Sequence, residues 1–192
     1  MKYFNLAATA LATMIAGVSN PAGAADLELA LSNQSAMTEV IADSASIASG
    51  GADIHMGLLF NEIDDVVGHA GLIVRGRPVN EQAVSFGLGA GLYYASLDTP
   101  SRSVGALTLG FELEYTIPGN TPIGLGGSLF YAPDVTTFSD GDSLLDLKLR
   151  AEIDVLPSAT AFIGYRKLST DLTSGGEHKM DDNVHVGIRI QF

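Results

Sequence analysis

The chain carries long stretches in which apolar and polar residues strictly alternate. In SLLDLKLRAEIDVLP, residues 143–157, every second position from Leu145 to Val155 is apolar, and charged side chains from Asp146 to Asp154 fill the positions between. Helical spacing would spread these charges around a cylinder, whereas a strand places them on one face. The pattern therefore predicts β-strands.

The same alternation recurs along the chain, most clearly in VGALTLGFELEYTIP, AVSFGLGAGLYYA and DNVHVGIRIQF. It predicts ten strands, near residues 26–32, 37–47, 52–60, 66–75, 83–95, 104–117, 123–132, 143–156, 160–168 and 183–192. The segment 37–48 has the weakest pattern and could instead be a helix or an unpaired loop. Without it and the strand before it, eight strands remain, which is still the even number of a single-chain bacterial barrel.

Alternation alone does not decide which face meets water. The predicted strands exceed the roughly 5 to 6 residues usual in soluble proteins and suit the roughly 9 to 11 residues of a bilayer crossing. Aromatic residues near strand ends would form interfacial girdles, namely Phe60, Tyr94, Tyr115, Tyr131 and Phe192. We therefore expect an all-β fold, a transmembrane antiparallel up-and-down β-barrel with its apolar face toward lipid. A soluble lipocalin-like barrel, with that face inward, is the alternative.

The connections between strands suggest an orientation. If the last strand ends in the periplasm, the tight connections at 117–122 and 156–159 are periplasmic, and the longer ones at 132–143 and 169–182 are extracellular. Short periplasmic turns and longer outer loops are typical of such barrels.

The amino end predicts a signal peptide over residues 1–24. Lys2 supplies the positive charge, Leu6 to Val18 the apolar segment, and Ala22-Gly23-Ala24 the small-residue cleavage site. The apolar segment is shorter than the roughly 20 residues that a spanning helix needs. We expect export, cleavage before Ala25 and a barrel domain over 25–192 in the outer membrane of a Gram-negative bacterium.

Composition excludes several function classes. The formal net charge of −12 argues against a nucleic-acid partner, whose phosphates require Lys and Arg. The absence of cysteine excludes disulfides, a lipid-modified cysteine and thiolate chemistry. No G-x-S-x-G or H-E-x-x-H motif occurs, so we expect no catalytic residues, no cofactor and no enzyme activity.

Two groups of residues raise the question of metal binding. His55 and His69 share the inward face of a predicted hairpin, but no third ligand at suitable spacing is evident, so we expect no metal site. Acidic loop residues could meet the divalent cations that bridge lipopolysaccharide, and solvated loop acids are the simpler interpretation. These residues are Glu62, Asp64, Asp65, Asp140 and Asp142.

The polar face of the predicted barrel collects charges of both signs. The residues are Glu112, Glu114, Asp146, Lys148, Arg150, Glu152, Asp154, Arg166, His185 and Arg189. Isolated buried charges are costly, so we expect a salt-bridged network that fills a narrow lumen. A selectivity lining for small ions or solutes is the alternative.

The last strand ends on Phe192 and resembles the carboxy-terminal signal that the barrel-assembly machinery recognises; the alternative is that Phe192 fills a core edge. On a wider scale the chain resembles the YfaZ family of outer-membrane proteins. The resemblance rests on DLELALSN, GADIHMGLLFNEIDDVVGHAGLIVRG, VSFGLGAGLYYASLD, FELEYTIPGNTPIGLGGSLFYAPD, DLKLRAEI and FIGYRKL. It implies an outer-membrane β-barrel and transfers no catalytic residues.

These features together predict an integral outer-membrane barrel with a narrow, charged lumen and a structural or interaction role in the envelope. Its partners would be outer-membrane lipid, lipopolysaccharide and, during insertion, the barrel-assembly machinery. A small channel or transporter for ions or small polar solutes is the second hypothesis, and an outer-membrane enzyme is a third, less favoured one.

Overall fold

The computed structural model describes residues 25–43, 51–78, 83–98, 101–119 and 123–192. The predicted signal peptide, residues 1–24, lies outside the described residues. No helix in the described part is long and apolar enough to cross a membrane.

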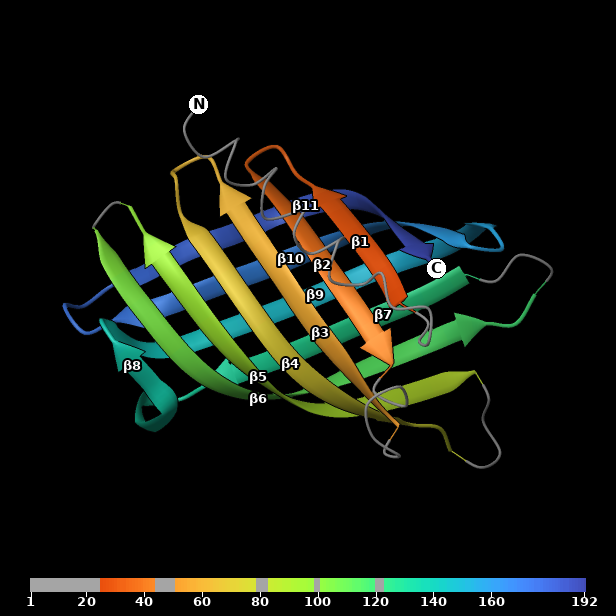
Figure 1. Ribbon diagram of the computed structural model, residues 1–192, viewed down its shortest axis with the longest axis horizontal. Helices are drawn as coiled ribbons and strands as arrows, with labels where there is room; N and C mark the ends of the chain where they lie inside the picture. Colours follow the sequence, from red (N-terminus) through yellow and green to blue (C-terminus); the bar gives the residue numbers. More distant parts are fainter. Residues whose placement is uncertain (1–24, 44–50, 79–82, 99–100, 120–122) are drawn as a thin grey trace.

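The described strands form one closed antiparallel barrel (Figure 1). Ten of them build its wall: β1 (Ala25–Leu31), β2 (Ser35–Asp43), β3 (Ala52–Asn61), β4 (Val66–Gly76), β5 (Val84–Leu97), β6 (Arg102–Ile117), β7 (Ile123–Ala132), β9 (Gly141–Leu156), β10 (Ala159–Leu172) and β11 (Glu177–Gln191). Each pairs with the next, and β1 pairs with β11 to close the sheet. The predicted all-β barrel is confirmed.

The uncertain segment at 37–48 contributes a strand, so the eight-strand alternative is wrong. Strand β2 pairs with β1 on one side and with β3 on the other, from Ser35 to Asp43. Residues 44–48 of the segment lie outside the described part. The weak alternation reflects the polar Thr38 on the outward face, where it pairs with Leu29 and Leu58, and the apolar Met37 and Ile41 on the inward face.

The two predicted outer loops differ from the expectation. Within 132–143 the chain forms a 3-10 turn, η2 (Asp134–Thr136), and a short strand, β8 (Thr137–Ser139), which pairs with β6 beyond the end of β7. Most of 169–182 is strand, because β10 runs to Leu172 and β11 starts at Glu177. A register shift between Leu168 and Ser169 breaks the alternation there and hides these strand ends in the sequence.

The outer surface of the barrel is apolar over most of its height. Leu88 is 65% exposed and Leu109 is 73% exposed, and similar exposed side chains come from every described wall strand except β2. They include Leu72, Phe86, Leu92, Phe111, Leu113, Leu149, Ile163, Val184 and Val186. A soluble lipocalin-like barrel would bury these residues, so that alternative is wrong.

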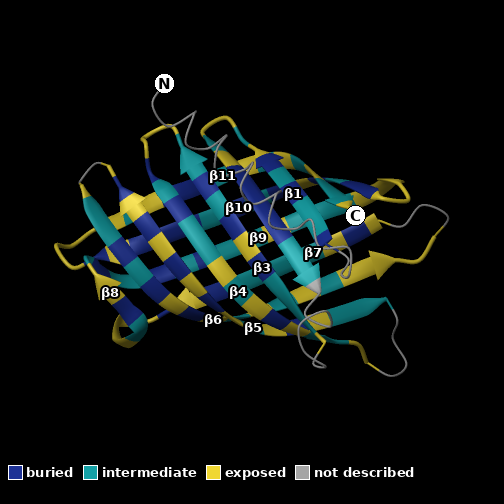
Figure 2. Cartoon of the chain, in the orientation of Figure 1, coloured by how far each residue is buried: buried dark blue, intermediate teal, exposed yellow. Residues whose placement is uncertain are grey.

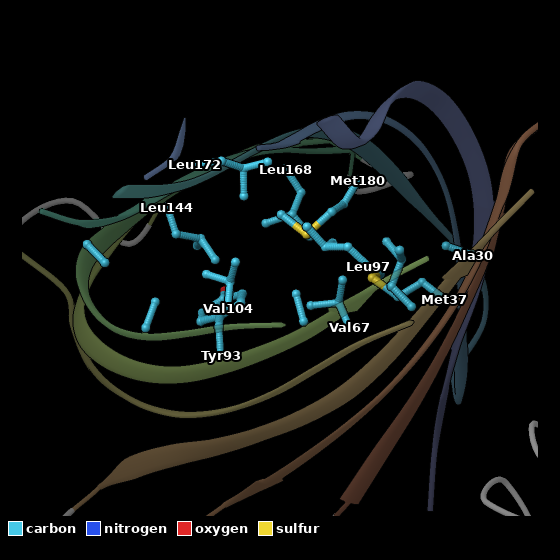
Figure 3. Close-up of a cluster of buried hydrophobic side chains, with 14 of the residues drawn as sticks. Ala30, Met37, Val67, Tyr93, Leu97, Val104, Leu144, Leu168, Leu172 and Met180 are labelled. Carbon is cyan, nitrogen blue, oxygen red and sulfur yellow. The ribbon is translucent and has the colours of Figure 1, made fainter. Parts of the chain in front are cut away.

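At the end of the barrel opposite Ala25 and Gln191, hereafter the loop end, the inward side chains are apolar. We call this cluster the apolar plug (Figure 3). It comprises Met37, Leu59, Val67, Leu97, Val104, Leu144, Leu168, Leu172 and Met180. Five of its members, Leu59, Val67, Val104, Leu144 and Leu168, are 0% exposed. The plug fills the lumen at the loop end.

The outward face changes character at the same height. Ser96, Lys167 and Asp171 point outward near the loop end. Farther from the loop end, the outward residues of the same strands are apolar, as at Leu88 and Ile163. The alternation of buried and exposed positions along the strands is visible in Figure 2. The loop end is therefore built like a water-soluble protein, apolar inside and polar outside, whereas the rest of the barrel is built the other way round.

Inward glycines allow aromatic rings to lie flat on the wall of the lumen. The Phe162 ring lies over Gly187, the Phe130 ring over Gly110, and the His69 ring over Gly57, each on a neighbouring strand. A Cβ atom at any of these glycines would overlap the ring. Small inward residues thus make room for large ones, as in other narrow barrels.

We predict that Gly187→Ala destabilises the barrel by about 1–3 kcal/mol, because the new methyl group would overlap the Phe162 ring and the carbonyl oxygen of Leu29. Gly68→Ala is the control, since the nearest atom to its Cβ, Leu58 Cδ2, lies at 3.4 Å. Denaturant titration of the refolded protein measures both. Equal unfolding free energies for the two variants would contradict the ring packing described for Gly187.

Candidate functional site

A buried ion pair lies directly below the plug. Arg166 on β10 donates from Nε to Asp146 Oδ1 and from Nη2 to Asp146 Oδ2 on β9, both at 2.9 Å. The two side chains are each 1% exposed. Tyr93 donates to the same carboxylate at 2.9 Å, and Arg166 Nη1 contacts Met37 Sδ at 2.8 Å. This layer joins the plug to the polar part of the lumen.

Beyond this layer the lumen holds a chamber with a cavity volume of about 70 Å³. Inward glycines such as Gly91 and Gly126 form one wall, and charged residues form the other. The chamber reaches toward the end that carries Ala25 and Gln191, hereafter the terminal end. There the inward-facing Thr116 and Asp154 are exposed, so this end of the lumen is open to solvent.

Glu28 on β1 is the centre of one ionic cluster. Its Oε2 accepts hydrogen bonds from Arg150 Nη1 and from Arg189 Nη2, each at 3.0 Å. Arg150 also pairs with Glu152 at 3.3 Å, and Arg189 with Glu152 at 3.8 Å. Strands β1 and β9 are not neighbours in the sheet, so the pair between Glu28 and Arg150 spans the lumen.

Glu39 on β2 is the centre of a second cluster. Its carboxylate accepts from Lys148 Nζ at 3.2 Å and from His55 Nδ1 at 2.8 Å, and it lies 3.6 Å from His69 Nε2. The His69 ring stacks on Tyr93 with 5.3 Å between ring centroids. Each ionised oxygen thus has a basic or imidazole neighbour, which offsets the cost of burying it.

Arg75 on β4 connects a third set of carboxylates. It pairs with Glu112 at 2.8 Å and with Asp53 on the other side. Neither Asp53 nor Arg75 was expected in the network.

The structure brings some of the predicted network residues together and leaves others apart. Asp146 pairs with Arg166, and Glu152 pairs with both Arg150 and Arg189. His185 packs edge-on against Phe162, with 5.8 Å between ring centroids. Asp154 is exposed and accepts from Thr160 at 2.7 Å. Among the described residues, no ion pair or hydrogen bond involves the Glu114 side chain.

Sequence reasoning missed Glu28, Glu39 and Tyr93 as members of the lumen network. Glu28 lies on the polar side of the alternation in ADLELAL, so its inward position was available from the pattern. Glu39 falls in the segment whose strand pattern was weakest. Tyr93 and Tyr94 are adjacent, and the pattern drew attention to Tyr94 on the outward face. Tyr93 faces inward.

The two histidines considered as a metal pair both contact Glu39 instead. Within the described ranges, no group of three or more potential ligands could hold a metal ion.

Not all of the loop acids are solvated. Asp65 is fully buried and bonds His178 at 2.7 Å and Asn61 at 3.1 Å, and it accepts from the Asp98 backbone N–H at 3.0 Å. These contacts tie three loops together, so the solvated interpretation is wrong for this residue.

Phe192 follows the end of β11 and does not fill a core edge. Its side chain is 74% exposed, and its backbone N–H donates to the carbonyl of Ala25 at 3.0 Å. The closing strand is therefore held to β1 up to its last residue, with the aromatic ring free on the outer surface.

We predict that Arg166→Met lowers the free energy of unfolding by about 3–5 kcal/mol, because it leaves the buried Asp146 carboxylate without its cation. Adding Asp146→Leu should recover most of this loss, since the double variant has no unpaired charge. A double-mutant cycle by denaturant titration measures the coupling. Additive effects of the two replacements would show that the pair contributes nothing.

The barrel is similar to several solved structures of outer-membrane proteins. Among solved structures, the barrel is similar to the outer membrane channel DcaP of Acinetobacter baumannii, with 10% identity and a TM-score of 0.43 over 86% of this chain and 54% of that one. It is also similar to the KdgM porin in complex with disordered oligogalacturonate, with 11% identity and a TM-score of 0.47 over 88% of this chain and 99% of that one. This chain thus spans about half the length of DcaP and nearly all of KdgM.

A third similar structure is an anion-selective porin from Comamonas acidovorans, with 13% identity and a TM-score of 0.37 over 82% of this chain and 49% of that one. No curated protein matches the sequence. The family model described as YfaZ precursor matches residues 1–192. Because the match covers the whole sequence, the chain belongs to the YfaZ family.

Proposed function

We propose that the protein is an integral β-barrel of the Gram-negative outer membrane with a structural or interaction role, and that its lumen is closed to the passage of solutes. The observation that carries this proposal is the combination of an apolar outer surface with the apolar plug. We assign the barrel no catalytic role.

The height of the apolar outer surface matches the thickness of a bilayer, which supports the proposal that the barrel spans a membrane. On β6 the outward apolar side chains run from Leu107 to Ile117, which fits the roughly 9 to 11 residues of a tilted crossing strand. Exposed tyrosines lie near both limits of this surface, with Tyr94 and Tyr131 toward the loop end and Tyr115 toward the terminal end. Aromatic side chains at both interfaces are a general feature of such barrels.

The orientation follows from the chain ends and the polar rim. We place the terminal end in the periplasm and the loop end outside. Lys167 and Lys179 would then lie at the level of lipopolysaccharide headgroups, each paired with an acid, Glu177 at 2.9 Å and Asp182 at 2.7 Å. Exposed Phe192 would face the periplasmic interface, where the barrel-assembly machinery acts on the closing strand.

The plug supports a closed lumen. Its side chains come from strands all around the barrel and leave no exposed surface at five positions. The ion pair between Arg166 and Asp146 adds a second layer with 1% exposure. A hydrated ion would have to displace both layers, whose packing resembles the interior of a soluble domain.

We predict that Leu149→Arg lowers the stability of the barrel in phospholipid bilayers by about 2–4 kcal/mol, because it places a charge against hydrocarbon. Ser96→Arg is the matched control, since Ser96 is also exposed and outward but lies toward the loop end. It should cost less than about 1 kcal/mol. Reversible unfolding in vesicles measures both, and equal costs would contradict the membrane position.

We predict that the refolded protein gives no single-channel steps in planar bilayers, and that Leu59→Ala combined with Leu168→Ala produces steps by opening the plug. The matched control is Leu88→Ala combined with Leu109→Ala, which removes the same atoms from the outer surface. Heat-modifiable electrophoretic mobility verifies that each variant is folded. Steps from the unmodified protein would contradict the closed lumen and favour the channel hypothesis instead.

A further inference from the structure

The chamber below the plug has a charge imbalance on its lining. Four carboxylates line it, Glu28, Glu39, Glu112 and Glu114, against three basic side chains, Arg75, Lys148 and Arg150. Each base contacts one of the first three carboxylates, at 2.8 to 3.2 Å. Glu114 is left over, since no ion pair or hydrogen bond reaches it from any residue that the structure describes.

The groups just behind this lining do not cancel the excess. Asp53 and Glu152 contact the basic side chains from outside the chamber, and Arg189 contacts Glu28 and Glu152. These residues add two carboxylates and one guanidinium, so the region keeps a negative excess. An anionic solute would therefore be repelled from the chamber.

Two buried imidazoles line the same chamber, and three of their four ring nitrogens lack a hydrogen-bond partner. The side chains of His55 and His69 are 9% and 5% exposed, and both line the cavity. The Glu39 carboxylate can only accept, so His55 Nδ1 donates to it, and in a neutral imidazole Nε2 is then an acceptor. His55 Nε2 is buried without a hydrogen-bond partner, and so are both ring nitrogens of His69. Buried polar atoms of this kind normally have partners.

The lining thus offers an unpaired carboxylate and unpaired imidazole acceptors, and it lacks hydrogen-bond donors for them. A metal ion fits poorly, because the Lys148 ammonium already lies 3.2 Å from Glu39 Oε2, where a metal would bind. An organic amine supplies both missing elements, since an ammonium group is a positive charge with three donors. The Phe130 ring and the glycine wall give its methylene groups an apolar surface.

We propose that the chamber is a binding site for a small aliphatic amine that enters from the terminal end, with Glu114 as its counter-ion and His55 as a hydrogen-bond acceptor. The site is blind, because the Arg166–Asp146 layer and the plug close it toward the loop end. The amine is bound rather than conducted. This inference uses the closed lumen of the proposed function, but conductance tests the plug whereas binding tests the chamber.

The test compares ligands that differ only in charge. The refolded protein, in a non-ionic detergent at low ionic strength, is titrated calorimetrically with 1,4-diaminobutane and 1,6-diaminohexane, and with the diols and dicarboxylates of the same chain lengths. Low salt is needed because screening weakens exposed charge pairs. We expect a diamine to bind about tenfold or more tightly than its diol, and the dicarboxylates not to bind.

Two variants locate the site. Glu114→Gln keeps the shape of the side chain and removes its charge, so it should weaken diamine binding about tenfold. Asp154→Asn is the control, because Asp154 is an exposed carboxylate on the same face that does not line the chamber, and it should leave the affinity unchanged. Heat-modifiable mobility verifies that both variants are folded.

Several results would overturn the proposal. They are no binding of either diamine, equal binding of diamine and diol, tighter binding of a dicarboxylate, or unchanged diamine binding by Glu114→Gln. A diamine that binds the chamber while the unmodified protein also conducts would leave the amine site intact and would contradict only the closed lumen.

Discussion

The pairing of every strand with two neighbours is the constraint on which this molecule depends. A closed sheet satisfies its backbone hydrogen bonds internally, so the wall can stand in hydrocarbon without exposed polar groups. The side chains alone then decide what each surface of the wall meets. Over most of the barrel the outward side chains are leucine, valine, isoleucine and aromatic residues, and the inward ones are glycines and charges.

An enclosed charged interior must balance itself, because each unpaired ion would lose its hydration without compensation. The three clusters around Glu28, Glu39 and Arg75 show how this is achieved. Their partners come from strands on different sides of the lumen, so the ionic contacts also join walls that the sheet does not pair directly. Glu114 is the exception to this balance, and the unused nitrogens of His55 and His69 lie in the same chamber.

At the loop end the inward face becomes apolar and the outward face becomes polar, so the two ends of the lumen differ. Inward leucines and methionines replace the charges there, and outward lysines and aspartates replace the leucines. The buried contacts of Asp65 with Asn61 and His178 hold the loops above the plug. The same chain thus combines a lipid-facing barrel, open at the terminal end, with a cap that has the hydrophobic core of a soluble protein.

The sequence by itself determined eight of the ten strands and which residues share a face of each, because a period of two is a local property of neighbouring residues; it left open the two strands near 26–32 and 37–47. That Leu149 and Arg150 face opposite sides of the wall follows from that period alone. Only the tertiary structure decided that Arg150 meets Glu28 and that Lys148 meets Glu39, because these partners lie far apart in the chain and across the lumen. It also decided the plug. The register shift after Leu168 and the adjacent Leu144 and Leu145 obscure the change of face, which becomes visible only when the eight strands that carry the plug close around one point.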